Sequence, residues 1–179
     1  GQEDQAARTH VRHALSATRK LRVVSLVPSL TETLLAWGIE PIAVTRFCEQ
    51  PRFESVGGTK DPDVERIVEL APDVVLVNDE ENRREDHDAL VASGMDVHVV
   101  SITSVHDVGP QLDRLRARLA LDPIPFVLPP AVPERLRAFV PIWRRPWMSL
   151  SASTYGSSLL AHLGIGNAIL LGNAAFLSF

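Results

Sequence analysis

The amino-acid sequence predicts an α/β protein built on a parallel β-sheet that is covered by helices on both faces. Four short apolar runs rich in β-branched residues alternate with segments of helical periodicity, a pattern that brings successive strands parallel. Nearly continuous hydrophobicity is typical of strands that are buried on both faces. The four runs lie at residues 23–27, 41–45, 73–77 and 97–100.

The segment from Arg22 to Gly38 organises the chain, because it combines a buried strand with a helix that follows directly. Pro28 ends the strand, and Ser29 with Glu32 forms the pattern of a capping box, which satisfies the free amides of a helix start. Gly38 closes the helix. Such a turn places amides and hydroxyls at the carboxyl edge of the sheet, where ligands of open α/β sheets bind.

The loop after the second strand contains a Gly-Gly-Thr-Lys run at residues 57–60. This run lacks the upstream glycine and the Gly-Lys-Ser/Thr order of a phosphate-binding loop, so we interpret it as a turn. Asp61 is expected to cap the next helix, with Pro62 in its first turn. Glu65 then lies near the helix start and has no place in the apolar pattern, so we expect it to be exposed.

Two further helices are predicted after the third and fourth strands. Asn82 with Glu85 matches a helix cap, and that helix should stop at Gly94. Ser104 caps a longer helix whose apolar residues recur at helical spacing as far as Leu119.

A stretch with five prolines separates this unit from the rest of the chain and cannot continue a helix. After it we expect a strand at Phe139–Trp143, a loop at residues 144–150 and a helix that closes at Gly164. The predicted organisation is an N-terminal arm, an α/β lobe with the start of a joining helix, a proline-rich linker and a partial second lobe, at residues 1–21, 22–121, 122–134 and 135–179.

Composition excludes several classes of function. The 179 residues carry a formal net charge of -4, which argues against a nucleic-acid binder with a basic face. Cys48 is the only cysteine, so no internal disulfide forms.

The apolar end of the chain, Ala168–Phe179, must pack on something, and we expect it to pair two copies as a homodimer.

No catalytic constellation is present in the sequence. It lacks a G-x-G-x-x-G after a strand, a G-x-S-x-G elbow and an H-E-x-x-H motif. His10 and His13 share a helical face that could hold a metal, but a solvated arm is the favoured interpretation. The acidic residues 79–81 suit either magnesium or, as we favour, a solvated helix start. We therefore expect no enzyme activity, no cofactor and no metal site.

Three aromatic residues, Phe47, Trp143 and Trp147, fall in predicted loops or at strand ends. Aromatic walls with few polar groups suit a large, flat, partly apolar ligand. Capping of the hydrophobic core is the alternative.

Several ordered motifs between Arg22 and Asn167 carry a resemblance to a known family. They are RVVSLVPSLTETLLAWG, FCEQP, VGGTKDPDVERIVELAPDVVLVNDEENR and WRRPWMSLSASTYGSSLLAHLG. The chain resembles the helical-backbone substrate-binding proteins of cobalamin and iron-siderophore import systems. This resemblance implies a Rossmann-like parallel-sheet lobe of a periplasmic-binding-protein-like fold, a second lobe, a metal-chelate ligand held between them, and delivery to a membrane ABC permease.

The resemblance also implies roles for individual residues. Phe47 matches the ligand-facing aromatic, Trp147 and Met148 match the aromatic turn that begins the second lobe, and Glu65 matches the acidic residue that docks on the permease. Trp143 joins this ligand-binding set. Cobalamin binders have tryptophans where this chain has Thr59 and Asn78, so the ligand is expected to be cobalamin-like or another chelate, siderophore or haem.

Two departures from the family concern the second half of the chain. The helical pattern gives way at Asp122, and the second lobe stops after about one β-α unit, as in a fragment or a shortened relative. The resemblance implies an extracytoplasmic protein, periplasmic or membrane-attached. The alternative is a cytoplasmic regulatory or interaction module on the same fold.

Overall fold

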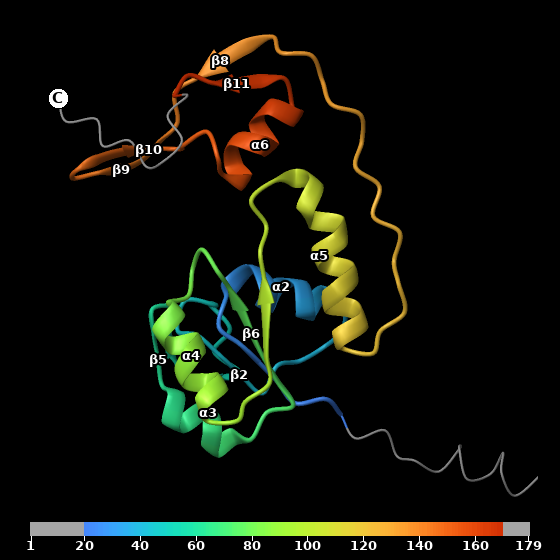
Figure 1. The fold of residues 1–179 in the computed structure, drawn as a ribbon, viewed down its shortest axis with the longest axis vertical. Helices are drawn as coiled ribbons and strands as arrows, with labels where there is room; N and C mark the ends of the chain where they lie inside the picture. Colours follow the sequence, from blue (N-terminus) through green and yellow to red (C-terminus); the bar gives the residue numbers. More distant parts are fainter. Residues whose placement is uncertain (1–19, 170–179) are drawn as a thin grey trace, which may run out of the picture.

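The computed structural model describes residues 20–169, which form an α/β lobe and a smaller second unit (Figure 1). The lobe consists of β1 (Val23–Ser25), α2 (Pro28–Ala36), β2 (Ala43–Val44), β3 (Glu54–Ser55), β4 (Gly57–Gly58), β5 (Asp61–Pro62), α3 (Val64–Leu70), β6 (Val74–Asn78), α4 (Arg84–Ala92), β7 (Val97–Val100) and α5 (Val105–Arg118). The second unit consists of β8 (Leu136–Ala138), β9 (Pro141–Arg144), β10 (Trp147–Ser149), α6 (Tyr155–His162) and β11 (Ile165–Asn167).

The lobe contains a five-stranded sheet with the order β3-β2-β1-β6-β7, and every neighbouring pair is parallel. The predicted parallel sheet is therefore confirmed, and its four predicted strands are β1, β2, β6 and β7. The sequence pattern missed β3, because both of its residues are exposed and polar. The chain goes from β1 to one edge and then crosses to β6 on the other side of β1, which places the topological switch between β1 and β6.

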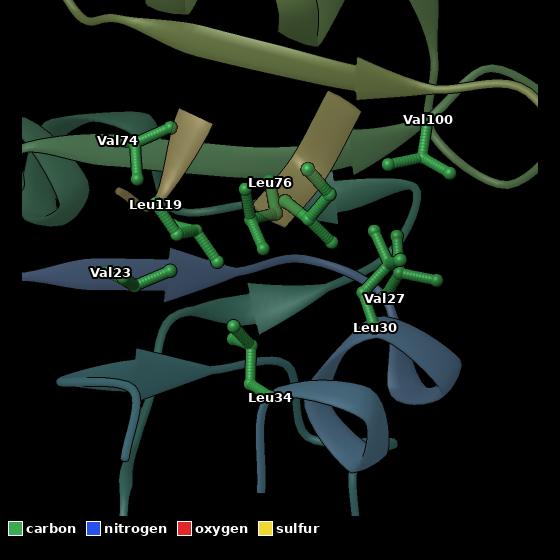
Figure 2. Close-up of a cluster of buried hydrophobic side chains, with 9 residues drawn as sticks. Val23, Val27, Leu30, Leu34, Val74, Leu76, Val100 and Leu119 are labelled. Carbon is green, nitrogen blue, oxygen red and sulfur yellow. The ribbon is translucent and has the colours of Figure 1, made fainter. Parts of the chain in front are cut away.

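Alternate residues of the central strands pack into two cores, one on each face of the sheet. Val23 and Leu76 face α2 and α5, whereas Val24 and Val75 face α3 and α4. Figure 2 shows part of the first core, in which side chains of β1, β6 and α2 lie together with Leu119. Each fully buried valine or leucine contributes about 1.5–3 kcal/mol through removal from water. Burial on both faces explains the unbroken hydrophobicity of these strands.

Three predicted helix caps, at Ser29, Asp61 and Asn82, are wrong by one or two residues. α2 begins at Pro28 with Val27 as its N-cap and no side-chain cap, so Ser29 lies inside the helix and Glu32 completes no capping box. Proline suits the first helical position, because its φ is already helical and it has no amide to leave unsatisfied. The helix α3 is capped by Asp63, whose carboxylate accepts a hydrogen bond from the Arg66 amide at 2.9 Å.

The residues displaced from these capping roles hold the loops together. Asp61 lies in β5 and pairs with Arg46 at 2.9 Å instead of capping a helix. Asn82 precedes α4 but does not cap it; its side-chain amide donates to the carbonyls of Leu26 and Thr59 at 3.2 and 2.8 Å. The predicted cap at Ser104 is confirmed, with Asp107 completing a capping box.

The second unit contains two small sheets and one helix. β9 and β10 form an antiparallel hairpin, so the loop predicted at residues 144–150 is wrong where β10 lies. Only two residues separate β9 from β10, so the sequence contains no long polar loop that would mark the turn between two strands. β8 and β11 pair in parallel around α6, which Thr154 caps.

The second unit contacts the lobe where α6 meets the start of α5. The Ser158 hydroxyl lies 3.0 Å from the Ser104 hydroxyl and accepts a hydrogen bond from the Val105 amide at 3.1 Å. The connecting segment carries no helix or strand, and it passes along α5 in Figure 1, with Phe126 against Gly109.

Two features of the sequence lie outside the described residues: the His10 and His13 pair, and the apolar end of the chain beyond Ile169. Among residues 20–169, no helix is both long and apolar enough to span a membrane.

Candidate functional site

The candidate site lies at the carboxyl edge of the five-stranded sheet, on the side that faces the second unit (Figure 1). Because the strands are parallel, the segments that follow β1, β2, β6 and β7 all emerge at this edge. These segments supply a helix start, an aromatic loop, an acidic turn and a capped helix.

A buried cluster of small polar side chains fixes the loop that carries Phe47. The Cys48 sulfur lies 3.3 Å from the Thr31 hydroxyl and 3.2 Å from the Thr45 hydroxyl, and the Thr31 hydroxyl donates to the Ser25 hydroxyl at 2.9 Å. The loop after β2 is thereby tied to the turn between β1 and α2. Phe47 stays on the surface with 53% of its area exposed.

The neighbouring Arg46 organises the outer part of the same loop. Its guanidinium stacks over the Phe47 ring at 4.9 Å from the centroid while it pairs with the Asp61 carboxylate. A cation over an aromatic face is attractive, so Arg46 restricts where the Phe47 ring can lie.

A hollow of about 400 Å³ opens at this edge between the lobe and the second unit. Pockets of this size lie within the range that binds small molecules, roughly 300–1,000 Å³. The lobe contributes most of the lining and α6 contributes Tyr155, so both units form the hollow. The lining side chains are Leu30, Ile102, Val108, Leu112 and Tyr155 on the apolar side, and Ser29, Thr33, Asn78, Glu80 and Glu81 on the polar side.

Hydrogen bonds within the turn after β6 set the position of the two acidic residues. The Asn78 side-chain oxygen accepts from the amides of Glu80 and Glu81 at 2.8 and 3.3 Å. The Asn82 side-chain oxygen in turn accepts from the Asn78 amide at 2.9 Å. Asparagine commonly stabilises turns in this way, and here it holds the two acidic residues at the hollow.

The electrostatic environment of Glu81 differs from that of a free surface carboxylate. Burial raises the pKa of Glu81, the charge of Glu80 raises it further, and the charge of Lys60 opposes both effects. Burial disfavours the charged form because the carboxylate loses water.

A second hollow of about 380 Å³ lies between the end of β6 and α4, with Asp79, Arg83, Arg84 and His87 in its lining. Within residues 20–169, no three His, Cys, Asp or Glu side chains come together as metal ligands.

The structure brings together only some of the residues predicted from the sequence. In the hairpin, Met148 pairs with Trp143 and Trp147 pairs with Arg144. Directly paired residues share a face and successive residues alternate, so Trp143 and Met148 lie on one face and Trp147 on the other. Phe47 lies on the lobe. None of the four predicted ligand-binding residues, Phe47, Trp143, Trp147 and Met148, lines the 400 Å³ hollow.

Glu65 is exposed in the first turn of α3, as expected. Sequence reasoning missed Ile102, Leu112 and Tyr155 as parts of a site. Apolar residues at helical spacing predict a core face equally well, and the sequence holds no signal that α6 covers this edge.

Comparison with known proteins gives a family and several relatives. The family model described as periplasmic binding protein matches residues 23–117. A vitamin B12-binding protein of Salmonella choleraesuis (strain SC-B67) is 31% identical over 100 residues, which cover 54% of this chain and 38% of the relative. A vitamin B12-binding protein of Yersinia pestis (strain Pestoides F) is 32% identical over 107 residues, which cover 56% and 38%. The matched region therefore spans well under half of these relatives.

Solved structures share the fold over most of the chain. The periplasmic vitamin B12-binding protein BtuF of Vibrio cholerae superposes with a TM-score of 0.67 at 18% identity, covering 88% of this chain and 70% of that one. The periplasmic heme-binding protein HutB of Vibrio cholerae gives a TM-score of 0.66 at 19% identity, covering 89% and 71%. At such identities the likeness establishes the fold alone.

Proposed function

The chain belongs to the periplasmic binding protein family, and from this premise we propose that it binds a cobalamin-like or other metal-chelate ligand for an ABC import system. The family and the related proteins are substrate-binding proteins, not enzymes, so we assign no catalytic residue. The related proteins are named for vitamin B12 and the structural neighbours for vitamin B12 or heme, which supports a ligand of this class.

The observation that carries the proposal is the hollow at the carboxyl edge of the sheet, formed by the lobe together with Tyr155 of α6. Parallel α/β sheets bind ligands at this edge next to a topological switch, and here the switch lies between β1 and β6. We propose that the ligand lies over this edge.

The exposed aromatic side chains supply contacts for the flat part of such a ligand. We propose that Phe47 contacts it from the lobe and that the hairpin contributes Trp143, Met148 and Trp147. Trp143 and Trp147 are 63% and 42% exposed, so each has apolar area left to bury. Because they lie on opposite faces of the hairpin, we expect one of them to contribute more than the other.

Glu65 and the cellular location complete the proposal. We propose that Glu65, exposed at the start of α3, docks on a permease, and that the protein acts outside the cytoplasm, as its family does. We also propose a homodimer that pairs through Ala168–Phe179. Family membership favours this transport role over an intracellular regulatory module.

Tryptophan fluorescence tests ligand binding, because two of the three tryptophans lie on the hairpin. Titration with hydroxocobalamin, haem and a ferric siderophore should give saturable quenching by at least one of them. We expect a Kd in the micromolar range, which corresponds to a binding free energy of about -8 kcal/mol. The affinity should be no higher because the second unit is small and leaves much of the ligand exposed.

Variants separate specific quenching from light absorption by the ligand. Trp143→Phe or Trp147→Phe should lose much of the signal, whereas Trp37→Phe should retain it, since Trp37 packs beneath Arg116 in the lobe. No saturable quenching with any of the three ligands would refute the proposed function.

A further inference from the structure

We propose that the hollow between the lobe and α6 selects a positively charged ligand group, which binds Glu80 and Glu81 while an apolar body lies against α5 and Tyr155. This inference rests on the proposed binding function and adds the charge class of the ligand group that enters the hollow.

One side of the hollow is lined by apolar side chains against which a ligand can pack. Val108 and Leu112 lie one turn apart on α5, Ile102 precedes that helix, and Tyr155 contributes its ring from α6. Tyr155 keeps 38% of its area exposed, which leaves surface for a ligand to cover. Burial of apolar area against these side chains would stabilise a bound ring.

The polar side of the hollow carries negative charge without a matching cation. Among the described residues that line it, two are glutamates and none is lysine, arginine or histidine. Within residues 20–169, neither Glu80 nor Glu81 forms an ion pair within 4.0 Å. Lys60 acts on Glu81 electrostatically but is not part of the lining.

The two carboxylates are positioned before a ligand arrives. Asn78 accepts hydrogen bonds from the amides of both glutamates, and Asn82 holds Asn78. A turn fixed in this way loses little conformational entropy when a cation binds. Burial raises the pKa of Glu81, so a cation bound beside this carboxylate would stabilise the charged form that burial disfavours.

Charge complementarity also determines what the hollow rejects. A carboxylate that entered the hollow would lie against two like charges in a partly buried site, so the hollow discriminates against anionic groups as well as favouring cationic ones. A neutral group of the same shape should bind with intermediate affinity.

Three isosteric probes test this inference: benzamidinium, benzamide and benzoate, which differ in charge but hardly in shape. Each is titrated into the 179-residue protein and followed by NMR chemical-shift changes. We expect benzamidinium to bind about fivefold more tightly than benzamide at low salt, benzoate to bind more weakly than either, and the preference to shrink at about 0.5 M salt.

Substitutions locate the source of the preference. The Glu80→Gln/Glu81→Gln double variant should bind benzamidinium and benzamide equally. The control Glu85→Gln removes one exposed charge from the start of α4 and should keep the preference. Equal binding of benzamidinium and benzoate by the wild type, or an unchanged preference in the double variant, would overturn the inference.

The outcome is distinct from that of the chelate titrations. Quenching by a chelate together with a charge-independent hollow would retain the proposed function and refute this inference. A cation preference without any chelate binding would refute the proposed ligand class and retain a cation-selective hollow.

Discussion

The contact between Gly109 and Phe126 should determine how the connecting segment lies on the lobe. A Cβ atom at residue 109 would lie 2.9 Å from Cδ1 of Phe126, closer than carbon atoms pack. Gly109→Ala should therefore displace the ring from α5. In the interior of a helix the same change gains about 1 kcal/mol from propensity.

The magnitude follows from burial. Phe126 is 45% exposed, so it buries about half of its side chain, and a fully buried phenylalanine is worth about 1.5–3 kcal/mol. Displacement should then cost about 1 kcal/mol and cancel the gain in helix propensity. Gly109→Ala should be nearly neutral alone and should stabilise by about 1 kcal/mol in a Phe126→Ala background.

A double-mutant cycle by urea unfolding measures this coupling as a difference in the free energy of unfolding. We expect about 1 kcal/mol for Gly109 with Phe126. The matched control pairs Gly109→Ala with Val127→Ala, because Val127 is 80% exposed and should show no coupling. Independent sites add within about 0.3–0.5 kcal/mol, so a coupling in that range would refute the packing of this segment on α5.

Three further predictions concern the surface, the pH response and self-association. In thermal melts, Glu65→Ala should change the free energy of unfolding by less than about 0.5 kcal/mol, yet the variant should dock more weakly once a permease is found. The control Ile67→Ala, at a fully buried site, should lower the free energy of unfolding by about 2–5 kcal/mol. Burial, and then the charge of Arg118, lower the pKa of His98 from 6.5, so the unfolded chain binds more protons than the folded chain. The free energy of unfolding should therefore keep its full value above pH 6.5 and fall as the pH drops below it. His98→Leu should reduce this dependence on pH. Sedimentation at micromolar concentration should show a dimer that a variant lacking residues 170–179 does not form.

Each of these three predictions has a result that contradicts it. Glu65 would be structural if its alanine variant melted like Ile67→Ala. His98 would not govern the pH response if the wild type and His98→Leu lost stability in parallel. A monomer at all concentrations would refute pairing through the apolar end of the chain.

The sequence by itself determined the lobe, because its strands are buried on both faces and its helices on one. Two-sided burial leaves unbroken apolar runs such as Val74–Val77, and one-sided burial leaves the helical spacing of α5. The cap at Ser104 was also predictable, because a side chain that bonds amides within one turn depends only on neighbouring residues.

The cap at Ser29 was mispredicted because Pro28 already occupies the first helical position, whereas the caps at Asp61 and Asn82 were mispredicted because distant parts of the chain bind those two side chains. Asp61 pairs with Arg46 from the loop after β2, and Asn82 bonds the carbonyl of Leu26 from the end of β1. Capping preferences of this kind are worth about 1 kcal/mol, so one tertiary contact can override them.

Only the tertiary structure decided where the candidate site lies. Tyr155 and Leu112 are far apart in sequence and look like ordinary helix residues, yet both line the hollow because α6 packs on the start of α5. The pairing of Trp143 with Met148, rather than with Trp147, likewise follows from the register of a hairpin. Periodicity records which side of an element is apolar, whereas the identity of the neighbour across that side is fixed by contacts between residues distant in the chain.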